Sequence, residues 1–269
     1  MKSMCSFFGI SRAAFYAWSR RMEAEDPDAE RMSWILEAYR ASHQTYGYRR
    51  IALALWSKHS IRINSKAVLR MMNKLGIRSV ARKRRVFRYM QGLETSHRYS
   101  NVLARDFHAI RPNQKWVTDV TYIPTQTGWA YLSTIKDLFD GFIVAHQLGR
   151  NNSVGLVLGT IRMAEEKEKI EAGLVLHSDQ GHQYTSHPYH LLTSGCGITP
   201  SMSRRGNCWD NAPMENFFGH LKEEALNHRP IPTFQEARQI IDDYIYFFNY
   251  ERIQLKTKQT PYQLRCLSS

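Results

Sequence analysis

The pattern of hydrophobic and polar residues divides the chain into a helical first part and a second part in which strands alternate with helices. Residues 9–19 predict a turn, a Ser11 N-cap and a short helix that directs Ala14, Phe15 and Trp18 inward. Such a segment is typical of the second half of a helix-turn-helix whose first half is short or missing.

Three further helices are predicted before residue 77. Asp28 is the predicted N-cap of a helix over 29–42, and the next helix begins at about Tyr48. Ser65 is the predicted cap of the last helix, which ends at Gly76. The apolar faces of the second and third helices consist of Ile51, Ala54 and Leu55, and of Val68, Met71, Met72 and Leu75.

The polar face of the helix after Ser65 carries side chains that reach phosphates and base edges. These residues, which recur at helical spacing, are Lys66, Arg70, Asn73 and Lys74. A DNA recognition helix has this composition, although any solvated helix face also carries Lys and Arg. The adjacent run RSVARKRRVFR at 78–88 has six basic residues and no acid, which favours nucleic acid. We therefore expect DNA contacts from Arg82, Lys83, Arg84 and Arg85 as well.

From residue 116 onward the pattern changes to strands. It predicts strands over 116–123, 129–138 and 142–149, a helix over 152–169, a strand over 173–179, a helix over 187–194, a strand over 198–202 and a helix over 212–226. Thr233 and Glu236 form a capping-box pattern that opens a long amphipathic helix.

Charge supports the same division. The first 104 of the 269 residues hold 20 Lys and Arg against 7 Asp and Glu, so the whole formal net charge of +13 lies there. The remaining residues are balanced, with 17 of each sign. A basic module joined to a neutral one is typical of polyanion binding that delivers a chemically active module, although an ordinary surface rich in basic residues is the alternative.

We expect five regions along the chain. These are a partial helix-turn-helix segment and linker at 1–28, a basic helix-turn-helix-like DNA-binding domain at 29–92, a linker at 93–110, a catalytic core at 111–228, and a C-terminal helix and tail packed on that core at 229–269.

Several classes of protein are excluded by composition. No apolar run reaches the roughly 18 residues that a membrane span needs, and the first residues lack a secretory signal, so we expect a cytoplasmic protein. The four cysteines form no C-x-x-C pair, which argues against a disulfide framework and a Cys-based zinc site.

Acidic residues occupy positions where a carboxylate is unexpected. Asp119 interrupts a β-branched, aromatic strand, and Asp179 ends a second apolar strand, where open α/β sheets place their chemistry. The helix over 212–226 offers three candidates for a third acid. At about 100° per residue, Glu215 flanks the buried arc, Glu223 is about 80° away and Glu224 lies opposite, so we select Glu215.

Three carboxylates without a thiolate pair suit Mg²⁺ or Mn²⁺, and two such ions can serve phosphodiester displacement. A cluster of histidines is the competing metal signal and consists of His177, His182, His187 and His190. Its spacing matches no zinc pattern, so we interpret it as loop and helix polarity.

The loop SRRGNCWDN at 203–211 leads to the helix of Glu215. We expect Arg204 and Arg205 to meet a phosphate backbone, and Lys222 to lie on the same side as Glu215. Asn207 and Asp210 are interpreted as turn and cap formers.

These segments resemble the insertion sequence 3 family of bacterial transposases, specifically the second-reading-frame (OrfB-type) product with a core similar to retroviral integrases. The resemblance rests on the acids in KWVTDVTYI, LHSDQGHQYTS and NCWDNAPMENFF, with 35 residues between Asp179 and Glu215 and with Lys222 seven residues further on. TYGYRRI at 45–51 and YFFNYERIQLKTKQTP at 246–261 extend it over nearly the whole chain.

The resemblance implies a ribonuclease H-like five-stranded mixed sheet flanked by helices, preceded by the helical basic domain. It implies catalysis of DNA cleavage and strand transfer by Asp119, Asp179 and Glu215 with two Mg²⁺ or Mn²⁺ ions. The implied partners are the element's terminal repeats and target DNA, further copies of the chain, and the upstream-frame product of the same element. The place of action would be the bacterial nucleoid.

Two other functions stay open at this point. A non-catalytic regulator could bind element ends through the basic helices alone, and a ribonuclease H-like nuclease could cut without joining. Dependence on a divalent ion separates the first from a transposase, and a strand-transfer assay separates the second.

Overall fold

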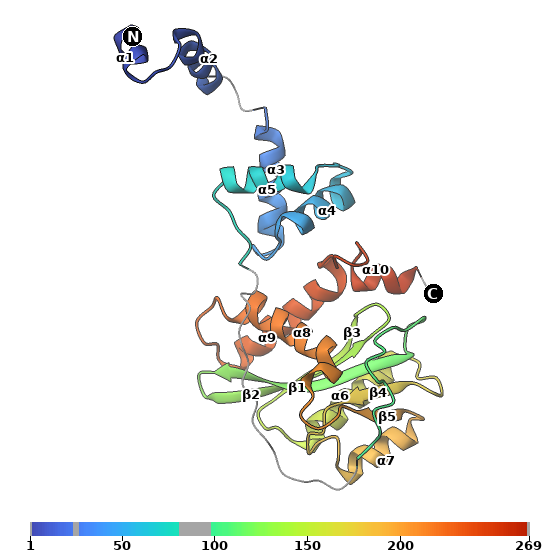
Figure 1. The fold of residues 1–269 in the computed structure, drawn as a ribbon. Helices are drawn as coiled ribbons and strands as arrows, with labels where there is room; N and C mark the ends of the chain where they lie inside the picture. The colour runs from blue at the N-terminus through green and yellow to red at the C-terminus, as the bar shows by residue number, and fades with distance from the viewer. Residues whose placement is uncertain (1, 24–26, 81–97, 268–269) are drawn as a thin grey trace. The chain divides into compact units, whose positions relative to one another are not determined.

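The computed structural model describes residues 2–23, 27–80 and 98–267, and the chain forms two compact units (Figure 1). The first unit spans Met1–Ser79 and the second Val80–Ser269. None of the helices within the described ranges is long and apolar enough to cross a membrane. The predicted DNA contacts Arg82, Lys83, Arg84 and Arg85 lie outside the described residues.

The first unit is entirely helical in its described part. Its helices are α1 (Lys2–Phe7), α2 (Arg12–Glu23), α3 (Ala29–Ala41), α4 (Tyr48–His59) and α5 (Ser65–Lys74). Helices α3, α4 and α5 contact one another and enclose a small core. The core residues are Ile35, Tyr39, Ile51, Ala54, Leu55, Val68, Met71 and Met72, which confirms the apolar faces predicted for α4 and α5.

The inward face predicted for the helix after Ser11 is wrong. Ser11 does accept a hydrogen bond from Ala14 N, at 3.1 Å. However, Ala14 is exposed, Trp18 is 52% exposed and Phe15 is only half-buried. The physical reason is that α1, the helix packed against α2, has only six residues and offers little apolar surface to cover it.

Two predicted N-caps are also corrected. Asn64, not Ser65, caps α5, because its extended backbone lets Oδ1 accept a hydrogen bond from Lys66 N at 2.9 Å. Asp28 occupies the N-cap position of α3, but its backbone is not extended and its side chain makes no capping bond. Its carboxylate instead pairs with Arg31 at 3.4 Å and with Arg70 at 2.9 Å.

The second unit is built on the predicted five-stranded mixed sheet. Its strands are β1 (Lys115–Thr125), β2 (Gly128–Asp137), β3 (Ile143–Gly149), β4 (Val175–Ser178) and β5 (Thr199–Met202), in the spatial order β3-β2-β1-β4-β5. Strands β1, β2 and β3 pair antiparallel, whereas β4 pairs parallel with both β1 and β5. The central strands β1 and β4 therefore place Asp119 and Asp179 near each other, since Val117 is opposite His177.

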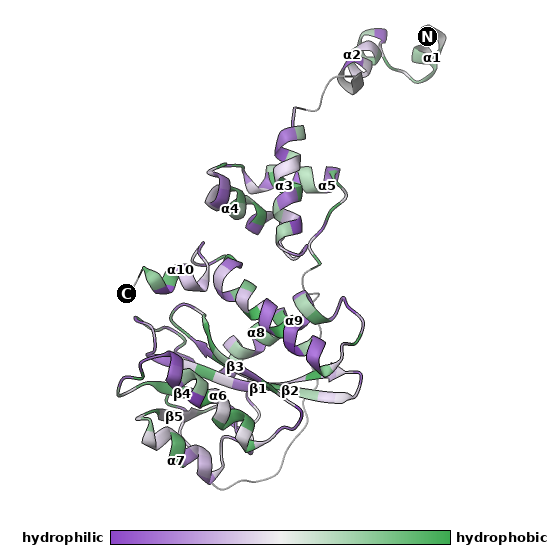
Figure 2. Ribbon diagram, turned by 180° about the vertical axis from the view of Figure 1, so that it is seen from behind, coloured by the Kyte–Doolittle hydropathy of each residue, from purple (hydrophilic) through white to green (hydrophobic). Residues whose placement is uncertain are grey.

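Helices cover both faces of this sheet. Helices α6 (Val154–Lys167) and α7 (His187–Gly195) lie on one face, and α8 (Ala212–Leu221) and α9 (Phe234–Tyr246) lie on the other (Figure 1). Hydrophobic and hydrophilic residues alternate along α9 (Figure 2), whose Ala237, Ile241 and Tyr244 are buried. The capping box predicted at Thr233 and Glu236 is present.

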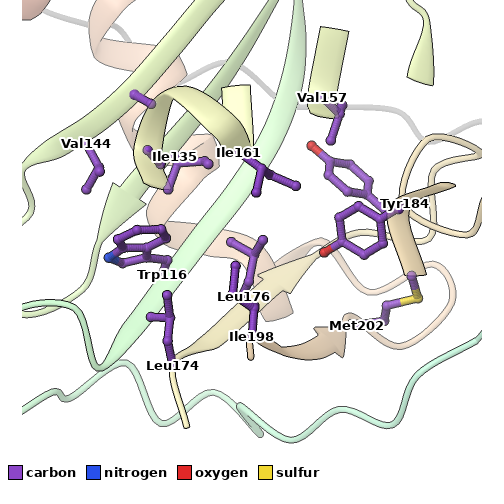
Figure 3. Packing of buried hydrophobic residues seen from close by; sticks show 13 residues of the cluster. Trp116, Ile135, Val144, Val157, Ile161, Leu174, Leu176, Tyr184, Ile198 and Met202 are labelled. Atoms are coloured by element: carbon purple, nitrogen blue, oxygen red, sulfur yellow. The ribbon is translucent and has the colours of Figure 1, made fainter. Parts of the chain in front are cut away.

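A large cluster of buried hydrophobic residues lies between the sheet and the pair α6 and α7 (Figure 3). Its largest members from the sheet are Trp116, Ile135, Val144 and Leu176, and those from the helices and their connections include Val157, Ile161, Tyr184 and Tyr189. Fully burying such side chains contributes about 1.5–3 kcal/mol each to folding. This packing holds rigid the strands that carry the acids.

The last helix, α10 (Pro261–Cys266), is fastened to the sheet by charge. Arg265 forms ion pairs with Asp137 and Asp140, each at 2.7 Å, and a third with Glu168. Asp137 and Asp140 are buried, so a guanidinium that meets both offsets their desolvation. The end of β2 and the end of the chain are thereby held together.

The predicted helix over 212–226 changes its winding near its end. It is α-helical to Leu221 and forms a π-turn over Lys222–Leu226, and a second π-turn follows α9 at Phe247–Glu251. Glu224, which is predicted to lie opposite Glu215 on the helix, falls in this π-turn and its side chain is directed inward. The Glu224 side chain is 1% exposed and pairs with the buried Arg252 at 2.6 Å.

The environment of Glu224 keeps it charged despite burial. Tyr244 Oη donates to Glu224 Oε2 at 2.8 Å, and Arg252 donates from Nε at 2.9 Å. Burial alone would raise the pKa of Glu224, but hydrogen bonds from His220 and Arg252 lower it to about 2. The π-turn thus joins α8 to the segment after α9 through a buried ion pair.

Replacing Arg252 with Met should lower the free energy of unfolding by about 3–5 kcal/mol, because Glu224 would remain as an unpaired buried carboxylate. Urea denaturation measures the change. The double substitution Arg252→Met with Glu224→Leu should recover much of it. Arg238→Met on the exposed side of α9 is the matched control and should change the value by less than about 0.5 kcal/mol. An Arg252→Met effect as small as the control's would contradict the importance of the pair.

His177 of β4 is the second buried titratable group with a defined environment. Its Nδ1 lies 2.8 Å from Ser201 Oγ, and its Nε2 lies 3.0 Å from Ser203 Oγ. The two hydroxyls can satisfy both ring nitrogens of a neutral imidazole. Burial lowers the pKa of His177 to about 4, against the opposing charge of Asp210.

Stability should therefore depend on His177 below neutral pH. Between pH 6.5 and 4 the unfolded chain binds a proton at this position and the folded chain does not, so the free energy of unfolding falls as pH drops through that window. From pH 7.5 to 4.5 the wild type should lose about 2–3 kcal/mol more than His177→Gln, measured by urea denaturation at both values. Equal losses would show that His177 is protonated in the folded state.

Candidate active site

Asp119 lies in the middle of β1, on the central strand of the sheet. It is half-buried, and its Oδ1 accepts a hydrogen bond from Val120 N at 2.8 Å. Desolvation, and then the negative charges of Asp179 and Glu215, raise the pKa of Asp119 well above its ordinary value, while Lys222 acts in the opposite direction. The electrostatic environment of Asp119 therefore includes both other predicted acids and the predicted lysine.

The other three side chains come from separate elements. Asp179 follows β4 directly, and its Oδ1 accepts a hydrogen bond from Gly181 N at 2.9 Å. Desolvation raises the pKa of Asp179, and the electrostatic interaction with His182 acts in the opposite direction. Glu215 is exposed in the first turn of α8, and Lys222 is half-buried at its end.

Lys222 occupies the position at which α8 changes to the π-turn. Desolvation lowers the pKa of Lys222, and the carboxylate of Asp119 counteracts that shift. The sequence places Lys222 on the same side of the helix as Glu215. The structure brings its charge to Asp119, so this end of the sheet joins three carboxylates and one ammonium group.

Two residues that contact the strand of Asp119 carry buried polar atoms without a hydrogen-bond partner among the described residues. Thr134 of β2 pairs directly across from it, and the Thr134 hydroxyl is buried with no hydrogen-bond partner among the described residues. Asn211 donates from Nδ2 to Thr118 O at 3.1 Å, while its own Oδ1 is buried and likewise lacks a partner in the described part of the chain. Oxygen atoms of this kind, beside carboxylates, suit a hydrated hard cation.

The acidic side chains do not form a complete set of metal ligands within the described residues. Across the ranges that the structure describes, no three His, Cys, Asp or Glu side chains are arranged so that they could hold a metal ion. Asp119 and the two acids that act on it nevertheless supply carboxylate oxygens, the type of ligand that Mg²⁺ and Mn²⁺ prefer.

The loop before α8 is organised by Asp210, which is predicted to form a turn and a cap. The turn is present, since Asp210 N donates to Asn207 O at 3.2 Å, but the cap is wrong: neither α8 nor the 3₁₀ turn Cys208–Asn211 has a side-chain capping bond. The buried carboxylate of Asp210 instead accepts hydrogen bonds from Arg204 and Arg105. Asn207 does not cap either, and its Oδ1 accepts from Arg105 Nη2 at 3.0 Å.

The predicted DNA contacts are dispersed over the two units. In the second unit, Arg204 and Arg205 are exposed, and Arg204 is ion-paired with Asp210 at 2.8 Å. In the first unit, the predicted face of α5 is exposed as a whole. Its members are Lys66, Arg70, Asn73 and Lys74, of which Arg70 pairs with Asp28. Two of the four predicted histidines contact hydroxyl groups: His177 contacts two serines, and His190 Nδ1 lies 2.7 Å from Tyr99 Oη.

Several residues of the site region were missed from the sequence. Arg105 falls in the predicted linker, where nothing in the residue pattern indicates a partner 105 positions away. Glu224, in the first π-turn, pairs with Arg252, which follows the second, and hydrophobic periodicity reveals neither turn. Asn211 sits in an obvious turn sequence, yet only the folded chain shows that it reaches the strand of Asp119.

Comparison with known proteins gives a consistent result. Family models match an HTH-like domain at residues 25–85 and an integrase core domain at 109–208, and a second integrase core model matches 215–268. Asp119 and Asp179 lie within the first integrase match, and Glu215 opens the second. The chain also resembles a simian T-cell lymphotropic virus intasome solved with the PP2A regulatory subunit B56 gamma. The TM-score is 0.51 at 14% identity, with 85% of this chain and 73% of that one covered, which is a likeness of fold.

Curated relatives are closer in sequence. The chain is 37% identical over 257 residues to the putative transposase InsK of insertion sequence element IS150 from Escherichia coli K12, covering 95% of this chain and 90% of that protein. It is 30% identical over 251 residues to the transposase InsF of insertion sequence IS3A from the same organism, covering 91% and 86%. With a five-stranded integrase-type core, an HTH-like region and relatives of this identity over nearly the full length, the chain belongs to the insertion sequence 3 family of transposases, which are polynucleotidyl transferases.

Proposed function

We propose that Asp119, Asp179 and Glu215 are the catalytic acids with which this transposase cleaves DNA and joins the freed end to target DNA. The observation that carries the proposal is the position of Asp119: a carboxylate on the central strand whose pKa is raised by desolvation and, beyond that, by the charges of Asp179 and Glu215. Acids whose charges act on one another in this way repel unless a cation lies between them, and metal-dependent phosphoryl transfer uses such a cation.

The three carboxylates would hold Mg²⁺ or Mn²⁺, with two ions as the expected number. When bound, such ions activate an attacking oxygen and stabilise a leaving oxygen. The chain's own residues have separate tasks. Lys222, whose charge already acts on Asp119, would hold a DNA phosphate beside the acids as a point charge without ligating an ion. Asn211 fixes the loop before Glu215 to the strand of Asp119.

DNA would be gathered by two surfaces. In the first unit, the exposed face of α5 supplies Lys66, Arg70, Asn73 and Lys74, and Arg82, Lys83, Arg84 and Arg85 follow in the sequence. In the second unit, Arg204 and Arg205 lie in the loop that leads to Glu215. The partners would be element terminal repeats and target DNA, bound by a homo-oligomer in the nucleoid, together with the upstream-frame product of the same element.

Substituting one catalytic acid should abolish cleavage and joining together while DNA binding persists. The test variants are Asp119→Asn, Asp179→Asn and Glu215→Gln, and each should reduce both products by at least about 100-fold, because both steps use the same acids. The measurement is a gel assay with a labelled element end, target DNA and Mg²⁺. Glu223→Gln, in the same helical segment but bonded to Asn227, is the matched control and should retain activity.

The same gel separates the competing functions. Joining by Glu215→Gln at the wild-type rate would remove Glu215 from the site. Binding without any product from the wild type in Mg²⁺ or Mn²⁺ would indicate a regulator, and cleavage without joining would indicate a nuclease.

Binding by the first 104 residues should be dominated by phosphate contacts, because the whole net charge of +13 lies there. Raising salt from 50 to 200 mM should weaken affinity on the order of a thousandfold or more if about six to ten phosphates are engaged. Lys66→Ala and Lys74→Ala should each reduce the slope of log affinity against log salt by about one. Lys167→Ala, an exposed lysine at the end of α6, is the control, and a flat salt titration of the wild type would contradict the prediction.

A further inference from the structure

A single buried carboxylate in the loop before α8 holds two arginines, one from that loop and one from the segment before β1. Asp210 is fully buried, and its Oδ1 accepts a hydrogen bond from Arg105 Nε at 2.7 Å. Arg204 donates two side-chain hydrogen bonds to the same carboxylate, from Nε at 2.9 Å and from Nη2 at 2.8 Å, and its backbone N donates a third at 2.9 Å. Asn101 adds a hydrogen bond from Nδ2 at 3.1 Å.

The charges in this group do not cancel. One arginine would suffice to neutralise Asp210, so the second leaves a net charge of +1. The Arg204 and Arg105 side chains are 58% and 44% exposed. Hydrogen bonds within the described residues use Nε and Nη2 of each guanidinium, which leaves Nη1 of both available for another acceptor.

The backbone around Arg105 is held in an unfavourable conformation. Ala104 and Arg105 have φ of 48° and 63°, in the left-handed region that residues with a Cβ seldom adopt. Asn101 Oδ1 accepts from Ala104 N at 2.9 Å, and Asn207 accepts from Arg105 Nη2, so side chains keep the strained turn in place. Strain maintained in this way is more frequent at functional sites than in ordinary connections.

The position of the group connects it to the catalytic acids. Asn211, the residue after Asp210, is bonded to Thr118 O, next to Asp119. On the other side, Leu103 N donates to Ser201 Oγ at 3.1 Å, which fastens the Arg105 segment to β5. The two arginines therefore sit on a rigid support that contacts the strand of Asp119 and leads within five residues to Glu215.

From this geometry we infer that Arg105 and Arg204, oriented by Asp210, form a binding site for one phosphodiester group of the DNA strand that enters the Asp119 site. The inference rests on the proposed function and adds to it a residue of the linker segment, Arg105. Asp210 fixes the plane of each guanidinium through its Nε, and Nη1 of each is left to donate to a phosphate oxygen. The ligand is a DNA backbone phosphate and not a base, so binding here would be independent of sequence.

The test compares Arg105→Gln and Arg204→Gln with wild-type full-length protein. The probe is a fluorescein-labelled 40-base-pair duplex of mixed sequence, and anisotropy is measured from 50 to 200 mM KCl. Loss of one phosphate contact should reduce the slope of log affinity against log salt by about 0.9 in each variant. The concentration of the same duplex, used as target, that gives half-maximal joining in Mg²⁺ should rise several-fold.

Two controls isolate the phosphate contact. Arg111→Gln removes an exposed arginine of the same segment that pairs with Glu171, at the opposite end of β4 from Asp179, and should leave the slope unchanged. Arg105→Lys and Arg204→Lys keep the charge but not the planar fork, so they should keep the slope and lower the affinity. If a Gln variant does not fold, as judged by circular dichroism, the Lys variants decide by their affinity.

Unchanged affinity, slope and half-maximal concentration in the folded variants would overturn the inference and leave the two arginines a purely structural role. That failure is distinct from failure of the proposed function. If the wild type joins DNA while the variants match it, the phosphate site falls and the function stands. If the wild type produces no cleavage while the slope still depends on Arg105, the phosphate site stands and the function falls.

Discussion

A carboxylate in the middle of a central β-strand is the constraint on which the second unit depends. Asp119 loses hydration because β1 is flanked by β2 and β4, and that loss must be offset by a donor, a cation or water. One backbone N–H and the charge of Lys222 stabilise the Asp119 carboxylate. The like charges of Asp179 and Glu215 increase the free-energy cost of its ionisation. An enzyme that binds cations can tolerate such repulsion, since the bound ion removes it.

Buried apolar residues on either side of Asp119 along β1 explain how its position is fixed. At its start, Trp116 is fully buried in the cluster beneath α6, and further on Ile123 is equally buried. Asp119 lies between these two anchors, and a shift of the strand by one residue would move Trp116 and Ile123 to the opposite faces of the sheet, away from the side chains they pack against. Packing on both sides therefore fixes the position of the charged residue.

The helix that carries Glu215 is held by polar contacts at both ends. At its start, Asn211 reaches the strand of Asp119, and at its end the π-turn directs Lys222 toward Asp119 and Glu224 toward Arg252. Single π-turns are frequent at functional sites, because one extra residue reorients the side chains that follow.

The sequence alone determined the order of elements and the family, and it singled out Asp119, Asp179 and Glu215 as the candidate acids. Those inferences rest on local periodicity and on short segments such as the one around Asp119, in which each residue is informative by itself. Tertiary structure decided which charges meet. Arg105 binds Asp210 across 105 positions, and Glu224 pairs with Arg252 from a separate helical segment. Pairings of this kind depend on burial and on the path of the folded backbone, and a one-dimensional pattern contains neither.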